Sequence, residues 1–512
     1  MGVYLGLEVI PDYINQDDWE RVFEETLKLV QAYPFATLSV EQKDDYKRLV
    51  LEQTKEQHLY VDGKTERYWK INGDLESKET GESFTLSSNL ERYKERKEDI
   101  QEKDILLYQR RNSGKGASEI FYAKTQGLPY HIPLLAIATL IESRFPQYAC
   151  VYGDITMEQA QKAVEWANSI LDKPITLPVR IDPPKLLESL KTIESDEKQL
   201  ETWYDIFIGD SEAIDRLVAK HFSIETVSCY LAKELRNFNS ATQLGAELLI
   251  IKGLNIGLPL EVLTDICCFH ENGPRFNAIE FSKALCSTWV MVAPEIRENL
   301  NLLNKSPETP ETVESQFGSI FLEVAFIGRR TKRFIPKDEV LKMLKKKFND
   351  TDQFVEVIET KYQEIVRLIE GHGRRLEEIE EELHNESEQN IVSTFGDLLY
   401  WDETKVVSED IIEVLTEIKN GVNNSLSKKD SQLMQVIGGL EKGPLIKLIT
   451  KLAQEQHNLI LSRSAWDWIE AENNDSLKRM VIVLFALESM GSATKLYRAV
   501  FENKGLFDKY LK

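Results

Sequence analysis

The chain has 512 residues, of which 42% are hydrophobic and 29% charged, and its formal net charge is −22. This composition is typical of a folded globular protein and excludes a collagen-like or wholly disordered chain. The length predicts about two to four domains. The strong negative charge opposes phosphate backbones, so we expect no nucleic-acid partner.

The sequence contains no sign of a membrane span, because no apolar run reaches the ~20 residues needed to cross a bilayer. The richest run covers residues 132–141. The first residues, Met1 to Glu8, lack the basic region of a secretion signal. Five cysteines form a sparse, odd set that favours free thiols in a reducing compartment. We therefore expect a cytoplasmic protein.

The first elements alternate between strand and helix patterns. Residues 3–10 are expected to form a strand, and Asn15 is expected to cap a helix that ends before Pro34. Strands are predicted at residues 47–53, 57–61 and 67–71, and at 105–109 and 120–124 on either side of a glycine-containing loop. Asp62–Gly63 and Asn72–Gly73 are typical hairpin turns.

A buried helix is predicted at residues 133–145 and a buried strand at 148–152. Thr156 and Gln159 have the spacing of a capping box at the start of the next helix. Sheet and helices in mixed order predict an α+β domain over residues 1–184. We place its end in residues 173–184, which hold four prolines.

The rest of the chain is predicted to be a large all-α region, either an irregular helical array or an α-solenoid-like one. Acidic residues concentrate at 374–388, so we divide this region into a helical domain, 185–384, and a C-terminal helical subdomain, 385–512. Predicted helices cover residues 186–207, 241–254, 277–292, 313–327, 337–348, 352–383, 391–401, 408–421, 442–461 and 477–490.

The loop from Ser113 to Ser118 resembles a phosphate-binding loop only in part. A Walker loop needs glycine where Gln109 stands, and Ser or Thr where Gly116 follows the lysine. A solvated hairpin tip is the favoured interpretation. Its basic residues, Arg110, Arg111 and Lys115, are candidates for contact with an acidic partner.

Other candidate binding residues are also arginines. Arg275 follows a tight turn, and Arg329, Arg330 and Arg333 form the sharpest basic cluster. Arg275 is a candidate for orienting a ligand carboxylate, and the cluster is a candidate for binding an acidic protein surface or RNA, although cations also stabilise helix termini by themselves. The pair Cys267–Cys268 beside His270 lacks further ligands at zinc spacing. We therefore expect no metal site and no cofactor.

The weak catalytic candidate is Asp154, which follows a buried strand and precedes a helix. Active-site carboxylates are found at such positions, and so are ordinary helix-capping aspartates, which is the interpretation we favour.

The sequence contains no established catalytic motif, so we expect a non-enzymatic protein-interaction protein that binds a protein partner. The turn at residues 153–156 and the helix after it resemble uncharacterised bacterial proteins, and this resemblance implies no activity. A bacterial immunity or defence-associated factor is one form that such a protein takes. The alternative is a hydrolase with a site at strand ends near Asp154. The oligomeric state stays open.

Overall fold

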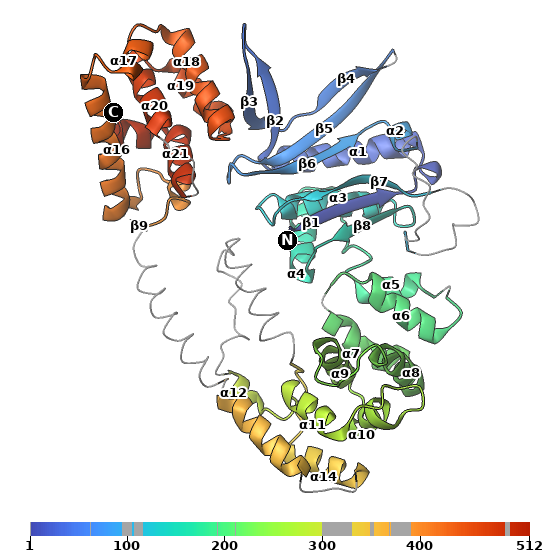
Figure 1. Cartoon of the computed structure of the whole chain (residues 1–512). Helices are drawn as coiled ribbons and strands as arrows, with labels where there is room; N and C mark the ends of the chain where they lie inside the picture. The colour runs from blue at the N-terminus through green and yellow to red at the C-terminus, as the bar shows by residue number, and fades with distance from the viewer. Residues whose placement is uncertain are drawn as a thin grey trace.

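The structure is a computed structural model that describes residues 2–61, 63–94, 105–106, 116–191, 193–209, 211–298, 330–348, 353–367, 369, 391–486 and 492–512. It confirms the predicted fold class, an α+β N-terminal domain followed by helical regions. In Figure 1 the strand-rich domain (blue to cyan) lies between the middle helices (green to yellow) and the C-terminal helices (orange to red).

The N-terminal domain contains two sheets. The first is antiparallel, with strand order β7-β1-β8, and the second has the order β11-β3-β2-β5-β4, with β6 paired to β5. In the second sheet, β11 (Leu461–Ser462) comes from the C-terminal part of the chain. The elements of the N-terminal domain are β1 Tyr4–Val9, η1 Pro11–Tyr13, α1 Gln16–Ala32, β2 Phe35–Gln42, β3 Lys47–Gln53, β4 Gln57–Val61, β5 Lys64–Asp74, β6 Thr80–Ser87, α2 Glu91–Lys94, β7 Ser118–Lys124, α3 His131–Arg144, β8 Ala149–Gly153 and α4 Met157–Asn168.

The core of this domain lies between helix α3 and strand β1. Leu5, Leu7 and Val9 alternate along β1 and are fully buried, because successive side chains of a strand point to opposite faces. Helix α3 is buried around most of its circumference and contacts β1 and β8 on that inner face. The outer face of the first sheet therefore carries the alternate residues of β1, namely Tyr4, Gly6 and Glu8.

One prediction about the second sheet is wrong. Asn72 and Gly73 lie inside β5 instead of forming a hairpin turn. The buried amide of Asn72 accepts a hydrogen bond from the backbone of Leu38 at 3.2 Å and donates one to Ser83 at 2.7 Å. Strands β2 and β6 were not predicted at all. The hairpin at Asp62–Gly63 is confirmed by the pairing of Val61 with Lys64.

The predicted strand at residues 105–109 lies largely outside the described residues, and residues 105 and 106 form no strand. Strand β7, predicted as its partner, pairs instead with β1. The stretch 173–182 after α4 is tied to the N-terminal domain, because Arg144 donates to the Lys173 carbonyl at 2.6 Å and Val179 donates to Glu142 at 2.6 Å. The domain boundaries at residues 184 and 384 stay predictions.

The middle helices gather around α9, which contacts α7, α8, α10 and α11. The predicted helix at 186–207 is two helices, because the chain breaks after Leu190 and Ser195 caps a new helix by accepting from Lys198. The elements are α5 Pro183–Ser189, α6 Asp196–Ile206, α7 Ser211–His221, α8 Ile224–Leu235, α9 Leu244–Ile256, α10 Leu260–Thr264, η3 Asp265–Phe269, α11 Ala278–Ser287, α12 Pro294–Glu298, α14 Lys337–Lys347 and a helix at 353–367. Predicted segments 313–327 and 374–388 lie outside the described residues.

The C-terminal helices form their own apolar core. The prediction of a helix at 391–401 is wrong, because this segment forms a two-residue strand and then a 3₁₀ turn. Leu398 in this turn and Trp401 directly after it are buried in the C-terminal core. The elements are β9 Ile391–Val392, η5 Asp397–Tyr400, β10 Val406–Val407, α16 Glu409–Ser427, α17 Gln432–Ile437, α18 Lys442–Lys451, η6 Leu452–Gln456, β11 Leu461–Ser462, α19 Arg463–Ala471, α20 Asn474–Ala486, α21 Ser492–Glu502 and α22 Lys504–Tyr510.

The C-terminal helices dock on the outer edge of β3. Strand β11 pairs with β3 in parallel, and the amide of Gln454 extends this pairing. Its nitrogen donates to the Leu49 carbonyl at 2.6 Å, and its oxygen accepts from the Leu49 N–H at 2.9 Å. The edge of β3 is thus covered, which removes an exposed template for unwanted strand pairing.

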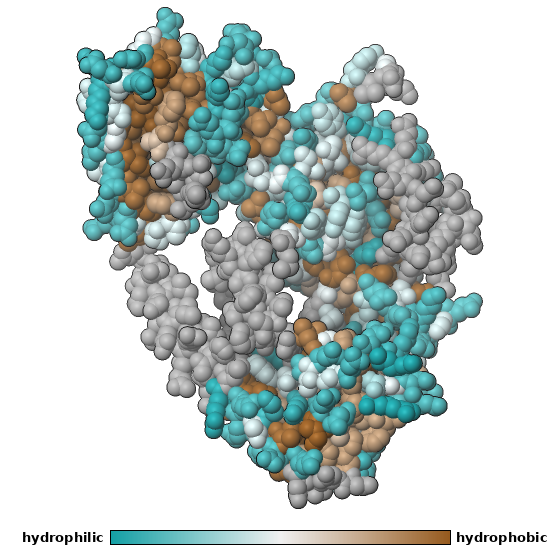
Figure 2. All heavy atoms as spheres, in the orientation of Figure 1, coloured by the Kyte–Doolittle hydropathy of each residue, from teal (hydrophilic) through white to brown (hydrophobic). Residues whose placement is uncertain are grey.

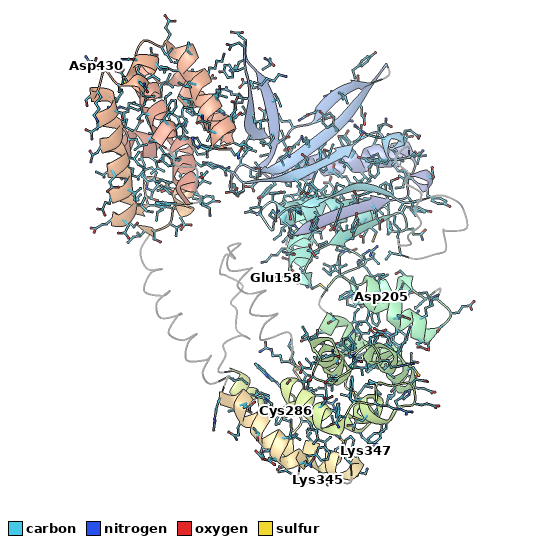
Figure 3. All side chains as sticks on the ribbon, viewed as in Figure 1. Glu158, Asp205, Cys286, Lys345, Lys347 and Asp430 are labelled. Atoms are coloured by element: carbon cyan, nitrogen blue, oxygen red, sulfur yellow. The ribbon has the colours of Figure 1, made fainter. Side chains whose placement is uncertain are left out.

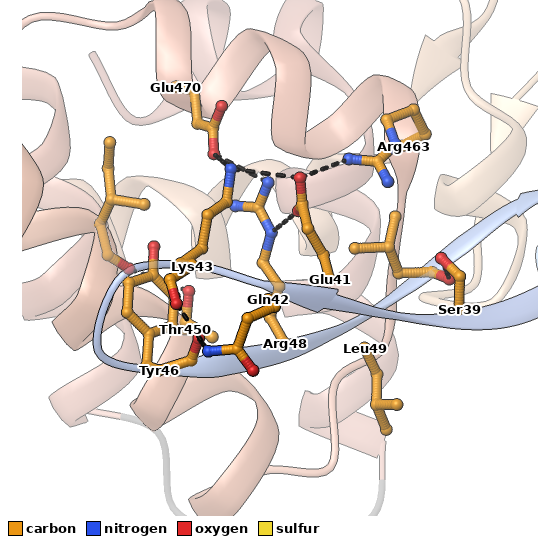
Figure 4. A network of polar contacts seen from close by, with 12 residues as sticks. Ser39, Glu41, Gln42, Lys43, Tyr46, Arg48, Leu49, Thr450, Arg463 and Glu470 are labelled. Carbon is orange, nitrogen blue, oxygen red and sulfur yellow. Dashed lines mark hydrogen bonds and ion pairs between the residues drawn. The ribbon is translucent and has the colours of Figure 1, made fainter.

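Ion pairs surround this junction (Figure 4). The Arg48 guanidinium bonds to Glu470 at 2.8 Å and to Glu41. Lys43 lies 3.2 Å from both carboxylates, and Arg463 lies 3.3 Å from Glu41. The side chain of Arg48 is only 1% exposed, so the network is closed to solvent at its centre.

The surface is mixed in character. Figure 2 shows hydrophilic residues over most of the face in view, with hydrophobic residues in a band along the C-terminal helices and in a smaller patch over the middle helices. Among the described residues, no helix is both long and apolar enough to cross a membrane.

Candidate functional site

The outer face of the sheet β7-β1-β8 brings together aromatic and charged side chains from three strands. Strand register places them in three rows: Lys124 opposite Tyr4, Tyr122 and Tyr152 on either side of Gly6, and Glu119 and Cys150 on either side of Glu8. We call these eight residues, with Asp154 at the end of β8, the tyrosine face.

The three tyrosine rings of this face form a continuous stack. The centroids of Tyr4 and Tyr122 lie 5.0 Å apart, and those of Tyr122 and Tyr152 lie 5.3 Å apart, each pair with an interplanar angle of 16°. Gly6 makes the second contact possible, since a Cβ atom at this position would lie 2.4 Å from the Tyr152 ring. Tyr122, at the centre of the stack, is nevertheless 47% exposed. Exposed stacked aromatics are typical of contact surfaces.

Carboxylates flank the stack. The Tyr152 hydroxyl donates to Glu119 at 2.9 Å, and the Tyr4 backbone N–H donates to Asp154 at 2.9 Å. Burial, followed by the hydrogen bond to Glu119, raises the pKa of Tyr152. Burial also raises the pKa of Tyr122, and the charges of Asp154 and Glu119 add to this shift. Carboxylates thus lie at both ends of the tyrosine stack.

One end of the tyrosine face is closed by the segment that leads to the middle helices. Arg180 donates to the Cys150 sulfur at 3.0 Å and lies 3.4 Å from Glu8. Beneath this contact, Glu142 accepts backbone hydrogen bonds from Val151 at 2.7 Å and from Val179 at 2.6 Å. Complete burial raises the pKa of Glu142 to about 7. These contacts attach Val179 to α3 and Arg180 to the sheet at the Glu8 end of the tyrosine face, whereas the Tyr4–Tyr122 end is not covered by this segment.

Asp154 does not cap a helix, so the interpretation favoured from the sequence is wrong. The N-cap of α4 is Thr156, which forms the predicted capping box with Gln159. Asp154 is exposed and belongs to the tyrosine face, where its backbone N–H donates to the Tyr4 carbonyl and its carboxylate accepts from the Tyr4 N–H. No described contact supports a hydrolytic role for it, and the hydrolase alternative stays a prediction.

The predicted arginine candidates are not brought together. Arg110, Arg111, Lys115 and Arg329 lie outside the described residues. Arg330 lies 6.0 Å from the Trp289 ring, and Arg333 donates to the Leu258 carbonyl just beyond the end of α9. The Arg333 contact is the helix-terminal role that basic residues often have. Arg275 is exposed, with a backbone φ of 55° in the turn before α11.

The cysteines are free thiols, as predicted. Burial raises the pKa of Cys268 to about 12 and that of Cys286 to about 12, and Figure 3 shows Cys286 within the middle helices. Within the described ranges, no group of three or more His, Cys, Asp or Glu side chains is arranged to hold a metal ion.

A second polar cluster lies inside the middle helices. The Lys252 ammonium lies 3.4 Å from the Tyr204 ring centroid and 5.6 Å from that of Tyr230, and the Tyr204 hydroxyl donates to Asp215 at 2.6 Å. Burial lowers the pKa of Lys252 and raises that of Asp215 to about 6. Because Asp205 and other carboxylates surround Lys252, its charge neutralises them, and we assign this cluster to stability of the helical core.

The tyrosine face was not recognised in the sequence analysis. Its signal is the alternation of Tyr4, Gly6 and Glu8 with buried apolar residues along β1, and a similar alternation over part of β7. Alternation predicts a face but does not tell which strands will share it.

The fold and this face together define a class: an acidic α+β protein with appended helical regions and a row of stacked tyrosines on the outer face of its first sheet. Comparison of the chain with protein-family models, with curated proteins and with solved structures finds no match.

Proposed function

We propose that this chain is a non-enzymatic protein-interaction protein, and that the tyrosine face is its contact surface for a partner with a basic surface. The observation that carries the proposal is the stack of Tyr4, Tyr122 and Tyr152, exposed at its central ring, between the carboxylates of Glu119 and Asp154. Aromatic rings attract cations through their electron-rich faces, and neighbouring carboxylates strengthen this attraction.

The overall charge of −22 favours the same kind of partner, because it accelerates encounter with basic proteins. A basic toxin or nuclease has the required charge, which fits an immunity or defence-associated role of bacterial type. Free, mostly buried thiols support a cytoplasmic location.

The test is binding of a fluorescent peptide in which lysine and arginine alternate with glycine and serine, with a glutamate version of the same length as control. We expect binding of the basic peptide alone, weakening as ionic strength rises. Tyr122→Ala should lower the affinity about five-fold or more.

The matched control is Tyr60→Ala, since Tyr60 is 74% exposed on β4 but lies outside the tyrosine face. Equal losses for Tyr122→Ala and Tyr60→Ala would show nonspecific attraction and contradict the proposal. So would equal binding of the basic and acidic peptides.

A further inference from the structure

Lys124 is the one basic side chain in the open rows of the tyrosine face. It lies directly opposite Tyr4 in the antiparallel register, and its ammonium is 5.2 Å from the Tyr4 ring centroid. Its hydrogen bond to Tyr4 raises the pKa of Lys124. The end of the tyrosine stack thus already has an ammonium group seated on it, within the ~6 Å range of cation–π contact.

The other contacts of Lys124 involve its backbone and its aliphatic stem more than its ammonium group. Its backbone N–H donates to Glu82 at 2.8 Å, but among the described residues no carboxylate lies within ion-pair distance of its ammonium. Its aliphatic stem passes close to Gly2, where a Cβ atom would lie 2.9 Å from the Lys124 Cδ. The ammonium of this half-buried side chain is therefore held mainly by Tyr4, through the ring contact and the hydrogen bond, and a lysine side chain changes rotamer readily.

We propose that Lys124 is an internal occupant of the cation-binding position on Tyr4, and that a lysine or arginine side chain of the partner displaces it. The inference rests on the proposed function and specifies how the same surface is regulated. Lys124 lowers the affinity of the tyrosine face for the partner, because the partner's side chain must first displace the Lys124 ammonium from Tyr4. Charge complementarity favours a basic occupant, since Asp154 accepts from the Tyr4 backbone and Glu119 bonds to Tyr152.

The test uses the full chain with Lys124→Met, which keeps the length of the side chain and removes its charge. We expect the basic peptide to bind about two- to five-fold more tightly, as the strength of an exposed cation–π contact implies. The control is Lys162→Met on α4, which removes the same charge outside the tyrosine face. It should change the affinity less than Lys124→Met does.

A double-mutant comparison isolates the contact. In a Tyr4→Leu background, Lys124→Met should give no gain beyond that of Lys162→Met, because the ring that holds the lysine is gone. If the wild type binds the basic peptide but Lys124→Met gives no extra gain, the inference is overturned and the proposed function stands. If neither the wild type nor Lys124→Met binds, the proposed function itself is overturned.

Discussion

The guanidinium carbon of Arg48 lies 4.4 Å from the ring centroid of Trp466, which joins a strand of the N-terminal sheet to a helix near the other end of the chain. Both side chains are almost completely buried. Arginine stacks on tryptophan while its planar donors reach carboxylates, which here are Glu41 and Glu470. This pair therefore fastens the C-terminal helices to β3.

Replacing Arg48 by methionine should weaken this junction. The change leaves Glu470 without its buried donor and removes the cation from Trp466, so we expect a loss of about 1–3 kcal/mol in the free energy of unfolding. Urea denaturation followed by tryptophan fluorescence measures it. Lys47→Met, on the same strand but exposed, should change this free energy by less than about 0.5 kcal/mol. Equal effects of the two changes would mean that the junction does not depend on Arg48.

The buried carboxyl of Asp215 should make stability depend on pH. Its pKa is raised from 3.8 to about 6, so the folded state binds the proton more tightly than the unfolded state does. This contribution is fully present below about pH 4 and is lost as the pH rises through about 6, which costs about 3 kcal/mol.

Asp215→Asn removes the titration, so its stability relative to wild type should increase between pH 4 and pH 7. Unfolding free energies from urea titrations at several pH values measure the difference. Asp430→Asn, at an exposed site in the turn between α16 and α17 (Figure 3), should show a flat difference. A flat difference for Asp215→Asn as well would show that this carboxyl does not titrate in the expected range.

Gly6 should tolerate no side chain. In Gly6→Ala the new Cβ would meet the Tyr152 ring at 2.4 Å, which should displace that ring from Tyr122. We expect a loss of about 1–3 kcal/mol in the free energy of unfolding and weaker binding of the basic peptide.

The contrasting change is Gly421→Ala in α16, where nothing lies within 4 Å of the position that the new methyl group would take. It should raise the free energy of unfolding by about 0.5–1 kcal/mol, because alanine is a better helix former than glycine. Thermal melts of both variants, with the peptide titration, measure these effects. A Gly6→Ala protein as stable as wild type would show that Tyr152 moves aside without cost.

Substitutions at Thr156 and Asp154 should have different effects: the first should lower the stability of the fold, and the second should lower the affinity for the basic peptide. Thr156→Ala removes the hydroxyl that accepts from Gln159 at the start of α4, which should cost ~0.5–2 kcal/mol. Asp154→Asn keeps an acceptor oxygen for the Tyr4 N–H, so its melting temperature should stay close to wild type.

The loss of the Asp154 charge should nevertheless weaken binding of the basic peptide, whereas Thr156→Ala should leave that binding unchanged at temperatures where the protein is folded. Melting curves and peptide titrations of both variants test this division. A destabilised Asp154→Asn with unaltered binding would assign Asp154 to the fold alone.

The sequence by itself determined the local elements. Asn15 caps α1 through a hydrogen bond to Asp17, Thr156 and Gln159 form the capping box, and β4 turns into β5 after Val61. These features were predictable because the interacting groups lie within a few residues of one another, so their geometry is set by backbone conformation and short side chains.

Three features depend on the tertiary structure alone: the tyrosine face, the junction at Arg48, and the position of Asn72 inside a strand. Tyr4, Tyr122 and Tyr152 meet because three distant strands pair in one register, and Gly6 leaves room for their contact. Asn72 joins a strand because partners on neighbouring strands satisfy its amide. Such contacts depend on burial and strand pairing between segments far apart in the chain, and local propensity carries no information about which segments will meet.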